Sequence, residues 1–213
     1  MYLNENEKKL ISQEIENLEK KSSVELVAVI TKNSSMYKYE KVLTALAITT
    51  IVSIIALFFS INTIIFFQLQ LVVFTLIYSL FYYFEDLILY FIPKKYKHQK
   101  ASYKANKEFG NLGIRNTKTK QGIMFFVSID EKYVEIITDK HIREKIDNKY
   151  WEDIINDFIK DVKNNELSKG YLKAINSCSK TLINKFPIQD NDINELSNEV
   201  RELWKIIKQL YLI

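Results

Sequence analysis

Two carboxylates and two neutral polar side chains lie near the ends of three predicted strands. Glu25 opens the first strand, Thr117 and Gln121 precede the second, and Asp139 follows the third. If the first two strands are parallel and the third runs back, these positions share one edge of a sheet. Carboxylate, hydroxyl and amide oxygens suit a hard cation, so we predict Ca²⁺ or Mg²⁺ bound by Glu25, Thr117 and Asp139. Solvated loops and helix capping by Thr117 and Asp139 are the alternative.

A secondary polar edge is predicted at the other ends of the same strands. Thr31, Asn33, Ser34 and Asp130 lie there. Open parallel sheets usually bind ligands at the carboxyl ends of their strands. This edge ranks second because Asp130 is its single carboxylate.

The elements that must position these residues are short strands and amphipathic helices. β-branched runs predict strands at 23–31, 122–129 and 133–138, the last two joined by a tight turn. Apolar residues at helical spacing predict helices over 3–18, 151–162 and 167–186. The predicted fold class is α/β (α+β), with a small mixed sheet covered by helices.

A transmembrane hairpin interrupts this domain after the first strand. From Val42 to Ile92 the only formal charges are Glu85 and Asp86. Crossing a bilayer takes about 20 apolar residues in a helix. Residues 42–59 and 64–84 each approach that length, so we predict two spans and the lipid bilayer as a partner.

The lysines around the hairpin predict its orientation. Lysines precede the first span and follow the second, whereas the intervening turn has neither Lys nor Arg. The positive-inside rule then places both termini and the soluble domain in the cytoplasm, at the inner (cytoplasmic) membrane of the cell.

The last segment predicts a C-terminal amphipathic helix. Apolar residues from Ile193 to Leu210 alternate spacings of three and four, as in a coiled coil. Self-association through this helix, docking on the chain's own domain and lying on the membrane are the three interpretations. The predicted organisation is a first part of the domain at 1–41, the hairpin at 42–92, a second part at 93–187 and the helix at 188–213.

Several classes of function are disfavoured by what the sequence contains. The net charge of +4 comes from interspersed Lys and Glu, so no nucleic-acid partner is expected. No Walker loop, GxGxxG, HExxH or GxSxG motif occurs. Cys178 stands alone on an apolar helix stripe, which indicates a core residue.

The order of these segments resembles the TPM domain family. The resemblance rests on "SSVELVAVIT", "FGNLGIRNTKTKQGIMFFVSIDEKYVEIITDKHI", "YWEDIINDFI" and "KGYLKAINSCSKTLINKFP". It covers about Leu10 to Pro187 without the hairpin, and it implies a compact sheet-and-helix domain of a bacterial membrane-associated protein. Glu25, Thr117, Gly122 and Asp139 match the edge cluster of that family. Lys132 stands where many members have Arg, which weakens a phosphate-binding role for the turn.

Two functions follow from the resemblance. Some members are accessory or assembly factors of membrane complexes, and others are ascribed phosphatase activity and calcium binding. With no strong catalytic set in the sequence, we favour a membrane-anchored interaction or assembly module that binds a membrane protein complex. A divalent-metal-dependent phosphatase is the alternative.

Overall fold

The chain divides into two compact units. The computed structural model describes residues 2–59, 62–164, 166–190 and 192–203. One unit, here called the domain, comprises Met1–Lys32 and Ala101–Ile213, and the other comprises Asn33–Lys100. Each unit is described by itself below.

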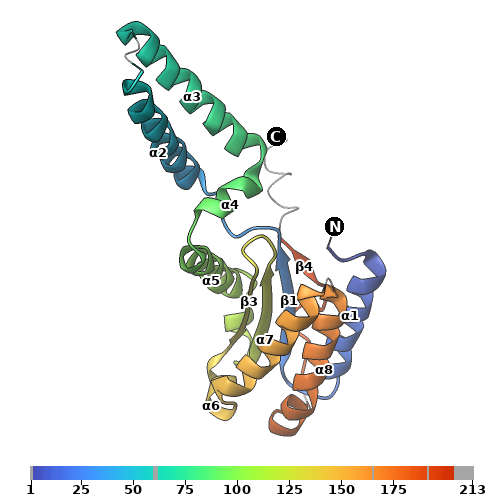
Figure 1. The fold of residues 1–213 in the computed structure, drawn as a ribbon. Helices are drawn as coiled ribbons and strands as arrows, with labels where there is room; N and C mark the ends of the chain where they lie inside the picture. Colours follow the sequence, from blue (N-terminus) through green and yellow to red (C-terminus); the bar gives the residue numbers. More distant parts are fainter. Residues whose placement is uncertain (1, 60–61, 165, 191, 204–213) are drawn as a thin grey trace, which may run out of the picture. The chain divides into compact units, whose positions relative to one another are not determined.

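The domain is built on a mixed sheet, which has four strands within the described ranges. Its strands are β1 (Glu25–Thr31), β2 (Gly122–Ser128), β3 (Tyr133–Thr138) and β4 (Arg201–Glu202), in the order β3-β2-β1-β4 (Figure 1). β1 is parallel to β2 and to β4, whereas β2 and β3 are antiparallel. The predicted parallel pairing of the first two strands is confirmed.

Helices cover both faces of the sheet, which explains why β1 and β2 are buried along their whole length. α1 (Glu5–Glu19), α6 (Lys140–Lys145), α7 (Asn148–Lys163) and α8 (Leu167–Lys185) share a core with one face. Figure 1 shows α1, α7 and α8 side by side over the sheet. The part of α5 (Lys94–Asn111) that belongs to the domain packs with η2 (Ile114–Asn116) on the other face.

The second unit is a helical hairpin. It contains α2 (Lys38–Leu57), α3 (Thr63–Tyr83), η1 (Glu85–Leu87) and α4 (Ile88–Phe91). Within the described part of the chain, α2 and α3 are long and apolar enough to cross a membrane. Small and polar residues line the buried side of α2, which lets α3 approach it closely: Ala45, Thr49, Ser53 and Ala56.

The prediction of a C-terminal helix is wrong for the part of that segment that the structure describes. Residues 192–203, here called the strap, contain no helix; they run as irregular chain and end in β4. Leu196 and Leu203 pack with the core on one sheet face, and Val200 packs with the core on the other. Hydrogen bonds to carboxylates, described below, favour this extended path over a helix. Residues 204–213, the remainder of the predicted Ile193–Leu210 seam, lie outside the described residues.

Candidate functional site

Glu25 and Asp139 lie at one edge of the sheet, as the strand order predicts. In the strand register Glu25 is opposite Gly122, and the Asp139 N–H donates to the Gly122 carbonyl at 2.8 Å. The two carboxylates therefore flank Gly122 in one row across three strands. Residues opposite one another in a sheet point to the same face, so the Glu25 side chain leaves the sheet on the face where a side chain at position 122 would lie.

An isoleucine covers the strand between the two carboxylates. A Cβ atom added to Gly122 would lie 2.3 Å from Ile114 Cγ2 and 2.7 Å from the Ile114 carbonyl oxygen. Ile114 is fully buried. Glycine is thus required at position 122, because its missing side chain makes room for Ile114 on the face to which Glu25 points.

The Glu25 carboxylate binds the strap. Its two oxygens accept hydrogen bonds from the backbone N–H groups of Glu195, at 3.0 Å, and Leu196, at 3.2 Å. Glu25 is 5% exposed. Burial raises the pKa of its carboxyl group, whereas the two hydrogen bonds act in the opposite direction.

Glu19 is a half-buried carboxylate at this edge, and sequence reasoning missed it. It accepts hydrogen bonds from the Leu26 N–H at 2.9 Å and from the side-chain amide of Asn198 at 2.7 Å. Burial raises the pKa of Glu19 to about 8, and the nearby charges of Glu25 and Asp192 add to the rise. The sequence does contain an indication of this role. Glu19 is an acidic residue in the last turn of a predicted helix, where its charge opposes the helix dipole and requires another hydrogen-bonding partner.

The remaining predicted residues have separate structural contacts. Thr117 is buried, and its hydroxyl donates to the Ile114 carbonyl at 3.4 Å. Gln121 Oε1 accepts from the Ser23 hydroxyl at 2.6 Å. Asp139 caps α6, with Oδ1 accepting from the Lys140 N–H at 2.7 Å, while its buried Oδ2 has no hydrogen bond within the described ranges.

These contacts determine whether Glu25, Thr117 and Asp139, the predicted metal ligands, can act together. The structure brings Glu25 and Asp139 to one edge, but the Glu25 oxygens are used by the strap and Ile114 lies over the strand between the two acids. Across the described ranges, no group of three or more His, Cys, Asp or Glu side chains is arranged to hold a metal ion. The donor set therefore does not form one coordination group in this conformation.

At the secondary polar edge, Asp130 lies in the turn between β2 and β3, where its N–H donates to the Lys32 carbonyl at 2.9 Å. Asn33 belongs to the hairpin unit, where it precedes α2. Sequence reasoning missed a buried polar contact at this end of the sheet, in which the Ser128 hydroxyl donates to Glu131. Lys104 Nζ also donates to the Thr31 hydroxyl at 3.2 Å, and burial lowers the pKa of this lysine.

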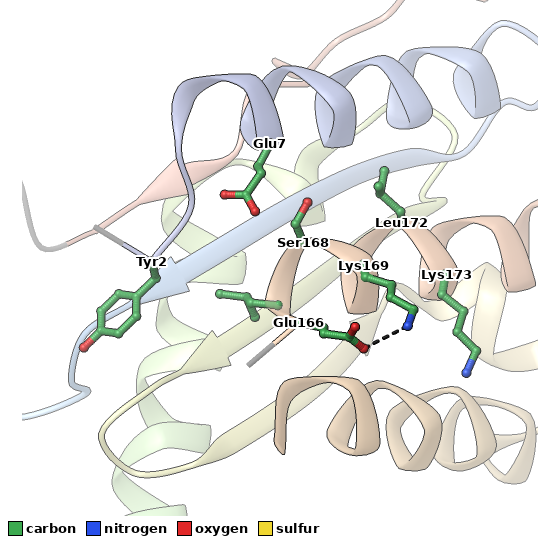
Figure 2. A pocket seen from close by; sticks show the side chains of 8 residues that line it. Tyr2, Glu7, Glu166, Ser168, Lys169, Leu172 and Lys173 are labelled. Carbon is green, nitrogen blue, oxygen red and sulfur yellow. Dashed lines mark hydrogen bonds and ion pairs between the residues drawn. The ribbon is translucent and has the colours of Figure 1, made fainter. Parts of the chain in front are cut away.

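An open pocket of about 610 Å³ lies between the start of α1 and the start of α8 (Figure 2). Its charged groups are already engaged. Glu7 completes a capping box with Asn4, Glu166 pairs with Lys169 at 2.8 Å, and Lys173 lies 3.5 Å from Asp161. The pocket therefore offers surface shape but no set of side chains poised for catalysis.

Comparison with known proteins agrees with the fold. A family model described as the TPM domain matches residues 86–181. The NMR structure of the BA42 protein from the psychrophilic bacterium Bizionia argentinensis is similar with a TM-score of 0.60 and 19% identity, over 95% of this chain and 96% of that chain. No curated protein matches this chain.

Residues 86–181 are similar to the TPM domain, and the sheet and helices of the domain agree with that match. The resemblance seen in the sequence is confirmed. The match spans β2, β3, α6, α7 and most of α8, while β1 joins the same sheet from before the hairpin. The likeness to BA42 supports the fold alone.

Proposed function

We propose that this chain is a membrane-anchored TPM-type domain that acts as an interaction or assembly module for a membrane protein complex. One observation carries the proposal: the polar edge of the sheet is filled by the chain's own strap. Glu25 binds two backbone N–H groups of the strap. These two bonds give Glu25 a structural role that holds the strap in place.

The membrane part of the proposal rests on the hairpin. Helices α2 and α3 have 20 and 21 residues, which is about the length needed to cross a bilayer. The flanking lysines place both helix ends that lead into the domain on the cytoplasmic side. In this proposal the hairpin holds the domain at the inner membrane, where it meets its partner.

The test is affinity capture of the full chain from native membranes in mild detergent. We expect a membrane protein complex to co-purify with the wild type and equally with Asp139→Asn. Asparagine caps a helix as well as aspartate does, so this variant keeps its fold. A chain truncated after Leu203 retains the strap. Comparing it with the full chain tests whether residues 204–213 contribute to binding of the membrane protein complex. Purification of the chain alone, with every variant, would contradict the proposal.

A divalent-metal-dependent phosphatase is the second candidate, and one observation favours it. Asp139 Oδ2 is buried at the sheet edge and has no hydrogen bond to any described residue, and a cation would supply a partner for it. The measurement is hydrolysis of p-nitrophenyl phosphate with added Ca²⁺ or Mg²⁺. Hydrolysis by the wild type that Asp139→Asn abolishes would replace the module proposal with this one. Hydrolysis that is absent, or unchanged in the variant, rejects the phosphatase.

A further inference from the structure

One face of α3 carries polar side chains although it points away from α2. The face is formed by residues that alternate spacings of four and three along the whole helix: Gln68, Val72, Thr75, Ser79 and Tyr82. Ser79 is half-buried and the other four are exposed. We call these five residues the polar face of α3.

The opposite side of α3 contacts α2. There Gln70 Nε2 donates to the Ser53 hydroxyl of α2 at 3.1 Å. Two residues correspond to about 200° around a helix, so Gln68 and Gln70 point in opposite directions. Gln70 has its partner inside the hairpin, whereas the Gln68 amide makes no hydrogen bond to any residue that the structure describes.

The outer surface of α2 is different. Apart from Tyr39 near its start, its large exposed side chains are aliphatic, among them Leu43, Leu46, Ile51 and Ile54. Its exposed Thr50 hydroxyl donates to the Leu46 carbonyl within the helix. Such a surface suits lipid tails, while an amide without a partner is costly in hydrocarbon. Polar residues within membrane spans normally face another helix. The hairpin thus has one surface suited to lipid, on α2, and one suited to a neighbouring helix, on α3.

We propose that the polar face of α3 is the contact surface of a homodimer, in which α3 of a second copy packs against it in the membrane. The proposal rests on the membrane anchoring in the proposed function. Two copies inserted in the same orientation hold Gln68 at the same depth, so a two-fold axis along the membrane normal brings the two amides together. Each amide has a donor and an acceptor and satisfies the other. The alternating spacing of the face is the pattern that packs two helices along their length.

The first test is energy transfer between donor-labelled and acceptor-labelled full chains in phospholipid bilayers, measured while the protein is diluted with lipid. We expect wild-type dimers and a dissociation constant about threefold to thirtyfold higher for Gln68→Leu, the range for interhelical hydrogen bonds. Gln70→Leu is the matched control, since it makes the same chemical change on the α2 side. We expect it to leave the dissociation constant unchanged.

A second measurement maps the face by cysteine cross-linking in a Cys178→Ser background. Val72→Cys lies on the polar face and should form disulfide-linked dimers on oxidation. Phe67→Cys is also exposed but lies about 140° away around the helix, and it should stay monomeric. Equal cross-linking at both positions would overturn the proposal.

Further outcomes of these experiments would also test the homodimer proposal. A wild type that shows no energy transfer at any lipid dilution overturns the homodimer, including the case in which the face binds a different protein. Equal weakening by Gln68→Leu and Gln70→Leu also overturns it. Extraction of the chain from membranes by alkaline carbonate would defeat the anchoring itself. A chain that resists extraction but stays monomeric defeats the dimer alone.

Discussion

At the scale of single residues, Glu25 and Gly122 have roles set by their neighbours. Glu25 opens β1 and binds the N–H groups of Glu195 and Leu196. Gly122 opens β2 and lies under Ile114. Both positions match the edge cluster of the family resemblance, and in this chain both have a packing or hydrogen-bonding role. A glutamate is needed at position 25 to accept the strap N–H groups, and a glycine at position 122 to leave room for Ile114.

Gly122→Ala should destabilise the domain. The new methyl group would overlap Ile114 Cγ2 and its carbonyl oxygen, which are 2.3 and 2.7 Å from the added Cβ position. Overpacking of this kind costs about 1 to 3 kcal/mol. The loss is measured as a lower free energy of unfolding in urea. Gly110→Ala is the control, because nothing lies within 4 Å of its added Cβ and alanine favours a helix. A loss of equal size in the control would show that the Ile114 contact is not the cause.

At the scale of elements, the strap replaces the predicted terminal helix. A spacing of three and four from Ile193 to Leu210 predicts a helix if only the segment itself is considered. In the folded chain, β1 presents an unpaired edge next to Glu19 and Glu25. Backbone groups of the strap pair with that edge and donate to Glu25, and the side-chain amide of Asn198 donates to Glu19. Hydrogen bonds to partners distant in sequence outweigh local helical spacing here.

The strap contact predicts a pH dependence of stability. Burial raises the pKa of Glu19 from 4.5 to about 8, so between these values the folded domain holds a proton that the unfolded chain releases. Stability is therefore full below about pH 4.5 and falls by roughly 1.4 kcal/mol per pH unit, levelling off above about pH 8. Urea titrations in detergent at pH 5, 6, 7 and 8 measure the slope.

Glu19→Gln should flatten this slope, since glutamine keeps an acceptor oxygen and does not titrate. Glu16→Gln on the same helix is the control. Glu16 is exposed and pairs with Lys20 at 2.7 Å, so its replacement should leave the pH dependence as in the wild type. A slope that survives Glu19→Gln unchanged would assign the dependence to another group.

At the scale of the whole molecule, the order of segments along the chain constrains the topology of the proposed membrane hairpin. β1 precedes the hairpin and β2 follows it, yet the two strands pair in one parallel sheet. Both flanks of a membrane hairpin must then lie on the same side. The lysine distribution independently predicts this arrangement, with the cytoplasm as that side.

Reporter fusions test this topology. A reporter that is active only in the cytoplasm should be active when it is fused after Ile213, and a reporter that is active only after export should be silent there. Insertion of the same reporters between α2 and α3 should reverse both signals. An exported signal at the C-terminal fusion would contradict the cytoplasmic orientation.

The sequence by itself determined the strands, most helices and the long apolar pair. These depend on local periodicity and residue type, which neighbours along the chain express directly. The parallel pairing and the shared edge of Glu25 and Asp139 followed from strand order. Only the tertiary structure decided that Ile114 covers Gly122, that Glu19 joins the site and that the strap forms β4. Each of these depends on contacts between residues far apart in the chain, and no local pattern encodes which segment fills a sheet edge.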